Sequence, residues 1–343
     1  MATAPEPADL VRDSAWLPHR YDENGDAFRF VHVPRAVHRK ATFLTDEFLP
    51  GADRPVAIDR AAALAAAPPP APVHFIFHSA YCCSTLLARA FDRPGSVMGL
   101  KEPVVLNDLS GWRHRGAQPR QLALVLDHAL RLLERPFTPG EAVVIKPSNL
   151  INVLAPAMLA MRPQSHALLL YAPLPLYLAS IAKKGMWGRL WVRELLSKQL
   201  KDGIIGYGFS PEDHLRHTDL QVAAIGWLAQ HALFQRLVEQ FGEDRVRTLD
   251  SEALLDSPRE AMARLTALFG LDWTDDRIAE VVQGEAFQRH SKLDTAYGAE
   301  ERQAEQRASA GAHSDEVEKV TVWAEAVAAS AGQSTTLSAP LLG

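Results

Sequence analysis

Five short apolar runs, separated by segments of helical periodicity, constrain the fold of this 343-residue chain more than any other feature. Each run is bounded by turn residues, as expected for a strand that is buried on both faces of a parallel sheet. A helix with leucines and valines along one face is predicted between the second and third runs, over residues 118–135. Strands that alternate with helices predict an α/β fold, a doubly wound parallel sheet of about five strands flanked by helices. The runs are Val73–His78, Val97–Leu100, Glu141–Lys146, His166–Tyr171 and Arg245–Leu249.

Composition shifts along the chain predict an extension, a main domain and a tail. The N-terminal part contains an alternating strand at Phe28–Val33 and a second short element at Thr42–Leu49, so it is a β-containing extension. It ends near three consecutive prolines at 68–70, which cannot continue a helix. A last helix is expected near residues 313–329. The expected domains are residues 1–70, 71–310 and 311–343.

Charge and cysteine usage exclude several classes of protein. A formal net charge of −5 argues against broad binding to nucleic acid or to anionic membranes. The two cysteines, Cys82 and Cys83, are adjacent, so neither a disulfide framework nor a zinc finger is expected, and no metal site is predicted. No apolar run reaches 18 residues and the N-terminus lacks the pattern of a signal peptide. We expect a soluble, cytoplasmic, globular protein, and the sequence does not determine its oligomeric state.

The loop after the first predicted strand has the features of an anion site. Ligands of such sheets bind at the carboxyl ends of the strands, and here residues 79–85 turn directly into a helix. Backbone N–H groups, the helix dipole and the hydroxyls of Ser84 and Thr85 together suit a phosphate or a sulfate. The loop contains neither Gly nor Lys, so it is not a Walker A sequence, and ordinary ATP or GTP hydrolysis loses most of its support. An ordinary serine N-cap remains the alternative interpretation.

Two further strand ends carry charged groups. Lys101 and Glu102 follow the second run, and Lys146 ends the third. A lysine stabilises negative charge and a carboxylate acts as a general base, although each group is also common in solvated loops. The coincidence of these groups at one predicted edge favours a site.

The residues at these positions resemble motifs of the sulfotransferase family over about residues 72–295. Tyr81-Cys82-Cys83-Ser84-Thr85-Leu86-Leu87 resembles the family's 5′-phosphosulfate loop, and Lys146-Pro147-Ser148-Asn149 resembles its K-x-P-x-N element. Residues 171–180, from Tyr171 to Ser180, resemble the segment that carries the 3′-phosphate site. Residues 287–292 resemble a late element of the catalytic domain. The chain is similar to a divergent bacterial-type member.

The resemblance implies a P-loop NTPase-like fold and transfer of a sulfuryl group from 3′-phosphoadenosine 5′-phosphosulfate (PAPS), without a metal. The acceptor is expected to be a small molecule with a hydroxyl or an amine. Lys101 and Lys146 would neutralise charge on the transferring group, and Glu102 would take the acceptor proton. The donor would be held by Ser79, Ala80, Tyr81, Cys82, Cys83, Ser84, Thr85, Ser180, His290 and Lys292.

Two positions depart from the family pattern and leave alternatives open. Tyr81 and Tyr171 stand where the family has basic residues near the phosphosulfate and the 3′-phosphate. Removing one such charge-stabilising donor costs about 2.7–4 kcal/mol in enzymes where this has been done. The first alternative is a non-catalytic protein that binds a nucleotide or anion on the same scaffold. The second is a divergent P-loop phosphotransferase, for which Asp250 is the candidate metal ligand.

Overall fold

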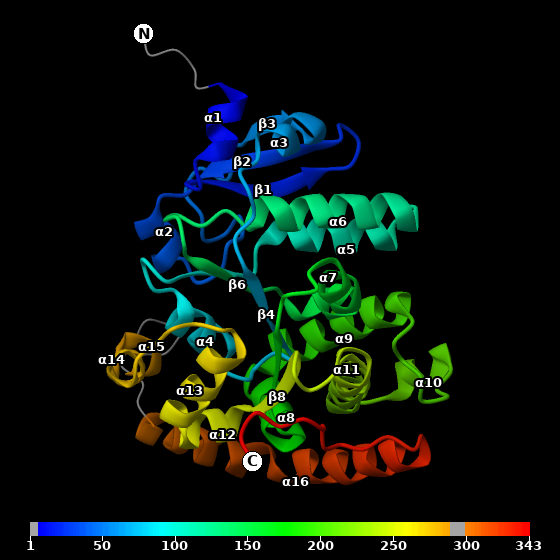
Figure 1. Cartoon of the computed structure of the whole chain (residues 1–343). Helices are drawn as coiled ribbons and strands as arrows, with labels where there is room; N and C mark the ends of the chain where they lie inside the picture. Colours follow the sequence, from blue (N-terminus) through cyan, green and yellow to red (C-terminus); the bar gives the residue numbers. More distant parts are fainter. Residues whose placement is uncertain (1–5, 289–298) are drawn as a thin grey trace. The chain divides into compact units, whose positions relative to one another are not determined.

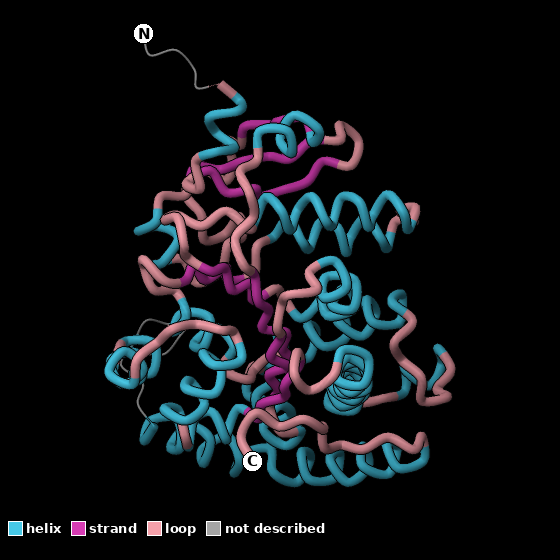
Figure 2. Tube along the Cα trace, in the orientation of Figure 1, coloured by secondary structure: helices cyan, strands magenta, loops and turns pink. Residues whose placement is uncertain are grey.

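A five-stranded parallel sheet forms the centre of the fold in a computed structural model that describes residues 6–288 and 299–343 (Figure 1). The strand order is β5-β6-β4-β7-β8, and Figure 2 shows these strands alternating along the chain with helices. The predicted α/β fold is therefore confirmed, and the strands match the five apolar runs to within one residue at each end. The strands are β4 (Val73–His78), β5 (Val97–Lys101), β6 (Ala142–Lys146), β7 (Ala167–Tyr171) and β8 (Val246–Asp250).

The strand order reverses at β4. This strand is the first of the sheet in the chain, yet it lies between β6 and β7. The parallel register sets Phe75 beside Ile145 and Lys101 beside Lys146. In open α/β sheets, ligands bind outside the carboxyl end of the strands where the order reverses. The loop that follows β4 is thus the first place to look for a ligand.

The chain divides into two compact units. The first contains residues up to Ile76 together with Thr85–His166, and the second contains Phe77–Ser84 and Ala167–Gly343. The first unit carries an antiparallel sheet in the order β1-β2-β3, drawn in blue in Figure 1, so the β-containing extension is confirmed. Strand β1 packs on α5 and α6. The leucine face of α6 is buried, as the helical spacing of its leucines predicts. The other elements of this unit are α1 (Pro7–Arg12), β1 (Trp16–Asp22), β2 (Ala27–His32), α2 (Arg35–Lys40), β3 (Val56–Asp59), α3 (Arg60–Ala66), α4 (Ser84–Phe91), α5 (Val104–His114), α6 (Pro119–Leu133), the 3₁₀ helix η1 (Asn149–Leu154) and α7 (Ala155–Met161).

Two details of the extension differ from the sequence-based prediction. Strand β1 was not expected, because a proline inside a strand removes a donor from the ladder, and Pro18 lies in β1 next to a shift in register. Residues 42–49, expected to form a regular element, consist of turns and bends. Residues 67–72, which include the three prolines, belong to no helix or strand.

The second unit consists of β7, β8 and a set of long helices. Helix α11 packs against α8, α9 and α16, and most of its residues are buried. Helix α16 extends well beyond the predicted 313–329, and Val320, Ala324 and Ala328 are its buried side chains in the part with described side chains. The helices are α8 (Leu174–Lys183), α9 (Gly185–Asp202), α10 (Pro211–Arg216), α11 (Asp219–Phe241), α12 (Ser251–Asp256), α13 (Pro258–Leu268), α14 (Asp275–Gln283), α15 (Glu285–Gln288) and α16 (Ala299–Ser330).

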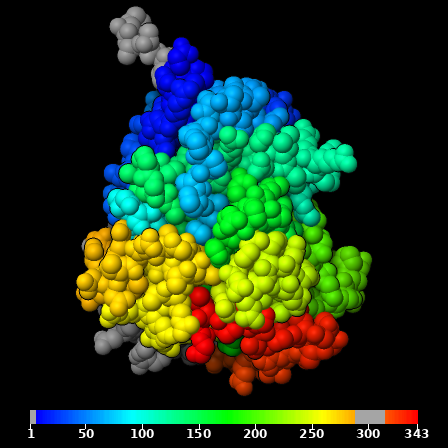
Figure 3. All heavy atoms as spheres, viewed as in Figure 1, coloured from blue at the N-terminus to red at the C-terminus, as the bar shows by residue number. Residues whose placement is uncertain are grey.

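The C-terminal segment returns to the edge of the sheet. Thr248 of β8 forms a parallel bridge with Pro340, and its amide donates to the Ala339 carbonyl at 2.9 Å. Figure 3 shows the C-terminal segment, in red, between the yellow and yellow-green segments of the same unit. Over the described ranges, we find no helix with the length and apolar character that crossing a membrane would require.

Candidate functional site

The loop between β4 and α4 is tied to the carboxyl end of β7. The Ser79 amide donates to the Leu170 carbonyl at 3.0 Å, and the Ala172 amide donates to Ser79 Oγ at 3.3 Å. The Trp227 indole N–H donates to the Ala172 carbonyl at 2.9 Å, which holds the same strand end from the side of α11. The start of the loop is therefore rigidly positioned within the second unit.

Three residues of this loop adopt a backbone conformation that L-amino acids rarely take. The φ angles of Ala80, Tyr81 and Cys83 are 71°, 53° and 63°, although none of the three is glycine. Such strain persists only where surrounding structure enforces it, and it concentrates at ligand sites. Left-handed residues next to ordinary ones turn successive backbone N–H groups toward one concave face, which is a common way to bind an anion.

Helix α4 begins where this loop ends. Ser84 is its first residue and Thr85 its second, and both are buried. The first N–H groups of a helix have no acceptor within the helix, and the helix dipole places partial positive charge there. Residues 79–85 thus lead from a strand into a helix, as the sequence predicts, and binding of an anion by this loop stays a prediction.

The two cysteines of the loop differ in their surroundings. Cys82 is fully buried, and its thiol donates to the Leu170 carbonyl at 3.4 Å. Cys83 is partly exposed. The Cys82 side chain thus helps to fasten the loop to β7, so we interpret it as a structural residue.

Tyrosines occupy both positions where the resemblance implies basic residues. The Tyr81 ring meets the ring of Trp191 edge-on, at 5.6 Å between centroids, and Tyr171 meets His231 in the same manner at 5.0 Å. Burial raises the pKa of Tyr81 to about 12 and that of Tyr171 to about 12, with the Asp250 charge adding to the rise for Tyr171. Both phenols therefore keep their protons near neutral pH and act as neutral hydrogen-bond donors.

Tyr177 is a residue near this loop that the sequence analysis missed. Its side chain is fully buried in the first half of α8, and its ring lies 6.0 Å from the Tyr81 ring. Ser180, predicted at the 3′-phosphate side, is partly exposed and lies three residues further along α8, on the same helix face. The sequence signal that could have identified Tyr177 is this spacing from Ser180.

In the first unit, the structure brings two of the predicted residues together. The Lys146 ammonium forms a hydrogen-bonded ion pair with the Glu102 carboxylate, and the Glu102 amide donates to the Lys146 carbonyl at 2.7 Å. Only 1% of the Lys146 side chain is exposed, and its ammonium lies 5.1 Å from the centre of the Phe43 ring. Glu102 has a φ of 54° and a side chain that is 20% exposed. The pair thus combines a buried cation with a carboxylate that solvent or a ligand can reach.

Lys101 does not join this pair. Its buried ammonium donates to the backbone carbonyls of His38 at 2.9 Å and Arg39 at 2.8 Å, at the end of α2. Burial lowers the pKa of Lys101 to about 8, against the opposing effect of Asp92. Because two carbonyls already hold the ammonium, we interpret Lys101 as a structural residue, and its expected role in charge neutralisation stays untested.

The remaining candidate site residues are His290, Lys292 and Asp250. His290 and Lys292 lie outside the described residues, so their predicted contacts with the donor stay predictions. Asp250, the candidate metal ligand of the phosphotransferase alternative, accepts the Glu252 amide at 2.7 Å and caps α12. Among the side chains that the structure describes, in residues 6–287 and 314–343, no group of three or more His, Cys, Asp or Glu could hold a metal ion.

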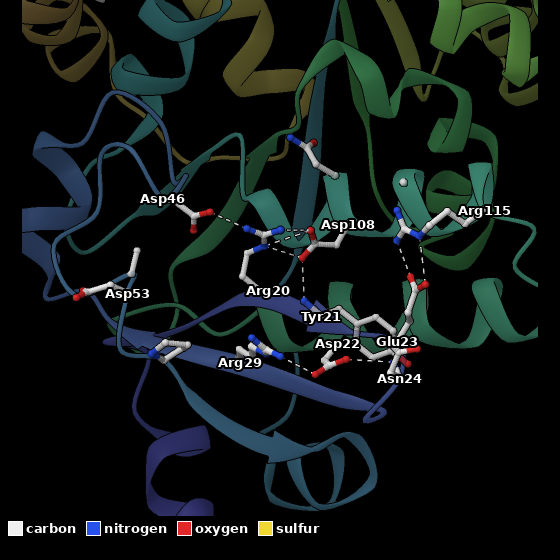
Figure 4. Close-up of a pocket in the computed structure, with 14 residues that line it drawn as sticks. Arg20, Tyr21, Asp22, Glu23, Asn24, Arg29, Asp46, Asp53, Asp108 and Arg115 are labelled. Atoms are coloured by element: carbon white, nitrogen blue, oxygen red, sulfur yellow. Dashed lines mark hydrogen bonds and ion pairs between the residues drawn. The ribbon is translucent and has the colours of Figure 1, made fainter.

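A pocket of about 960 Å³ in the first unit contains none of the predicted residues (Figure 4). It lies between β1, β2 and α5, and three arginines line it. Figure 4 shows that each arginine already meets carboxylates of the same lining: Arg20 meets Asp108 and Asp46, Arg29 meets Asp22, and Arg115 meets Glu23. The wall of this pocket is thus held together by its own ion pairs.

Comparisons with known proteins yield structural similarity only. No family model matches the chain, and no curated protein matches it significantly. Solved structures do match, and three of them are sulfotransferases.

The sulfotransferase domain from the Synechococcus PCC 7002 olefin synthase is 14% identical, covers 64% of this chain and 79% of its own, and has a TM-score of 0.40. The sulfotransferase domain from the curacin biosynthetic pathway is 15% identical, covers 66% and 84%, and has a TM-score of 0.39. Sulfotransferase STF9 from Mycobacterium avium is 12% identical, covers 75% and 78%, and has a TM-score of 0.42. All three TM-scores lie below 0.5, so the function of this chain has to be inferred from its own residues.

Proposed function

We propose that the chain is a sulfotransferase that moves a sulfuryl group from PAPS to a hydroxyl or amine of a small-molecule acceptor. The single observation that supports this most is the loop of residues 79–84, where the strand order reverses and three non-glycine residues adopt positive φ angles. A sulfuryl or phosphoryl oxygen is the kind of ligand that such a loop, followed by a helix N-terminus, binds well.

Each residue then has a defined role in the transfer. The loop amides and the hydroxyls of Ser84 and Thr85 hold the phosphosulfate, and Ser180 contacts the 3′-phosphate side. The acceptor oxygen or nitrogen forms a bond to sulfur while the bond from sulfur to the bridging oxygen of the donor breaks. The products are the sulfated acceptor and adenosine 3′,5′-bisphosphate.

The Lys146–Glu102 pair supplies the proton and charge chemistry in this proposal. The Glu102 carboxylate takes the proton that the acceptor loses, which requires hydrogen-bond reach of the acceptor and no metal. The Lys146 ammonium orients that carboxylate and adds positive charge opposite the negative charge that develops during transfer. Lys101 has no part, since backbone carbonyls hold its ammonium.

A non-catalytic binding protein is the second candidate, and the two tyrosines favour it. Tyr81 and Tyr171 are neutral, so a donor nucleotide would bind without full charge compensation at those positions. The two candidates differ in turnover and not in donor binding. Release of adenosine 3′,5′-bisphosphate from PAPS in the presence of an acceptor library would separate them.

The first test is calorimetric titration with adenosine 3′,5′-bisphosphate, with ATP as the control ligand. We expect selective micromolar binding, which corresponds to about −8 kcal/mol. Ser84→Ala and Thr85→Ala should each weaken it about tenfold, whereas Ser330→Ala, at the exposed end of α16, should leave it unchanged. Equal or absent binding of both nucleotides would refute the donor site.

A further inference from the structure

We propose that the phenols of Tyr177 and Tyr81 donate hydrogen bonds to the anionic oxygens bound by the loop of residues 79–84, so that this site binds its anion through neutral donors. The inference rests on the proposed function for the identity of the anion, and on the structure alone for the donors. Residues 79–85 contain no charged side chain, so the loop itself offers only amides, hydroxyls, thiols and one phenol.

The first supporting observation is an unsatisfied hydroxyl. Tyr177 is 0% exposed, and its hydroxyl has no hydrogen-bond partner among the described residues. Native proteins pair nearly all buried polar groups, because an unpaired one costs about 1–3 kcal/mol. A buried hydroxyl that keeps its bonding capacity in the free protein is explained when a ligand completes it.

The second observation is the direction of the Tyr177 side chain. Tyr177 is the fourth residue of α8, and helical side chains lean toward the N-terminus of their helix. That end of α8 follows the carboxyl end of β7, where the Ala172 amide donates to Ser79 Oγ at the start of the loop. The Tyr177 ring also meets Tyr81, a member of the loop, at 6.0 Å with an interplanar angle of 64°.

The third observation is that both phenols stay protonated. Burial raises the pKa of Tyr81 to about 12, and burial together with the nearby Tyr81 phenol raises the pKa of Tyr177 further still. A protonated phenol has one O–H to donate, and its bond to an anionic oxygen is charge-assisted and stronger than a bond between neutral groups. Two such donors partly replace a lysine or arginine without adding a buried charge to the second unit.

The deciding experiment compares Tyr177→Phe with the wild-type chain in two measurements. The substitution removes only the hydroxyl, so the melting temperature should stay the same or rise, because an unsatisfied buried group is lost. Affinity for adenosine 3′,5′-bisphosphate should fall at least tenfold, and Tyr81→Phe should lower it as well. Opposite movements of stability and affinity would support the proposal, since a merely structural tyrosine could not produce them.

Tyr207→Phe is the matched control within the same unit. The Tyr207 hydroxyl donates to Gln333 Oε1 at 2.6 Å, so its loss should lower the melting temperature and leave nucleotide affinity unchanged. If Tyr177→Phe binds the nucleotide as tightly as wild type, the inference is wrong while the proposed function stands.

If the nucleotide does not bind, titration with inorganic sulfate tests the phenolic donors separately from the proposed function. A wild-type chain that fails to bind the nucleotide refutes the proposed function, and sulfate titration then tests the inference alone. Weaker sulfate binding by Tyr177→Phe would still support phenolic donors. Equal binding by both chains, or no binding by either, would overturn them.

Discussion

The two compact units satisfy their buried polar groups in different ways. In the first unit, three buried charges pair with charges: Arg35 with Glu141, Arg162 with Glu134, and Lys146 with Glu102. Around the loop of the second unit, the buried polar side chains are neutral, and Tyr177 and His231 each keep an atom without a partner among the described residues. Buried atoms without a hydrogen-bond partner among the described residues also occur in the first unit, on both ring nitrogens of His38. The difference between the units therefore lies in the charge of their buried side chains.

Paired buried charges and unpaired buried neutral groups also affect the stability of the protein differently. A paired buried charge contributes specificity, and removal of its partner is strongly destabilising. An unpaired buried neutral group lowers the stability of the ligand-free protein, and a ligand that pairs with it removes this penalty. Four predictions would break or sharpen this contrast.

The largest expected effect is on catalysis, through the first unit. Glu102→Gln removes the proposed base but still offers an oxygen to the Lys146 ammonium. Turnover of PAPS should fall by about 10²–10⁴-fold, the usual contribution of general base catalysis, while nucleotide affinity changes less than twofold. Glu23→Gln, at the rim of the Figure 4 pocket, is the control and should leave turnover unchanged. Full activity of Glu102→Gln would remove the base assignment.

A charged pair of the first unit should have the largest effect on stability. Arg162→Met leaves the Glu134 carboxylate, 1% exposed, without its arginine, and the free energy of unfolding should fall by about 3–5 kcal/mol. The matched exposed pair is Lys198–Glu194 on α9, where Lys198→Met should cost about 0.3–0.5 kcal/mol. Urea unfolding measures both, and equal losses would contradict the contrast between paired buried and exposed charges.

Two buried histidines, one in each unit, predict acid sensitivity. Burial, with a smaller effect of His166, lowers the pKa of His74 to about 4, and burial lowers that of His231 to about 3. An unfolded histidine takes up its proton near pH 6.5, whereas these two resist it in the folded chain. Their contribution to stability is therefore complete above pH 6.5 and declines as the pH falls toward 4, by at most about 3 kcal/mol for His74 at 1.36 kcal/mol per pKa unit.

Variants assign this loss to the two units. His74→Asn keeps an acceptor near the His166 amide, and His231→Phe keeps a ring beside Trp227. Each should flatten the decline in unfolding free energy between pH 6.5 and 4, measured by denaturant titration at several pH values. A decline that both variants leave intact would show that other groups, such as the buried His38 or carboxylates, are responsible.

The smallest expected effect tests tertiary context against helix propensity. Sequence alone predicts that Gly226→Ala in α11 stabilises the helix by about 1 kcal/mol. In the fold, an added Cβ would lie 2.7 Å from Gln199 Oε1, and the Gln199 amide group donates to the Gly226 carbonyl at 3.1 Å. Loss of that bond should offset the gain, so the melting temperature should stay nearly constant. A clear rise would show that Gln199 moves away without penalty.

Local patterns in the sequence were sufficient for most of the fold. The five apolar runs predicted the five strands, since burial on both faces of a parallel sheet leaves a continuous apolar stretch. Helix α6 was predicted to within two residues at each end, because residues at helical spacing record which face is buried. Strand β1 was not predicted, because its proline and its register shift break the pattern that identifies a strand.

The partners of the polar groups could not be obtained in this way. Lys101 and Lys146 look alike in the sequence, each a lysine that ends an apolar run. Only the fold places the Lys101 ammonium on the carbonyls of residues 38 and 39, more than 60 positions away, and the Lys146 ammonium on Glu102. Likewise, Tyr177 reads as one more apolar position of α8 until the fold shows its hydroxyl buried and unpaired beside Tyr81.

The physical reason is that hydrophobic patterns are local in the sequence, whereas polar contacts join residues that are far apart in it. Hydrophobic periodicity is local, because each residue's burial follows from the helix or strand that contains it. The amino-acid sequence by itself therefore determined the five strands of the parallel sheet, helix α6 and the position of the loop at the end of β4. Hydrogen bonds and ion pairs form between atoms a few ångströms apart, whatever their separation along the chain. Which lysine is structural and which hydroxyl remains available to a ligand was therefore decided only by the tertiary structure.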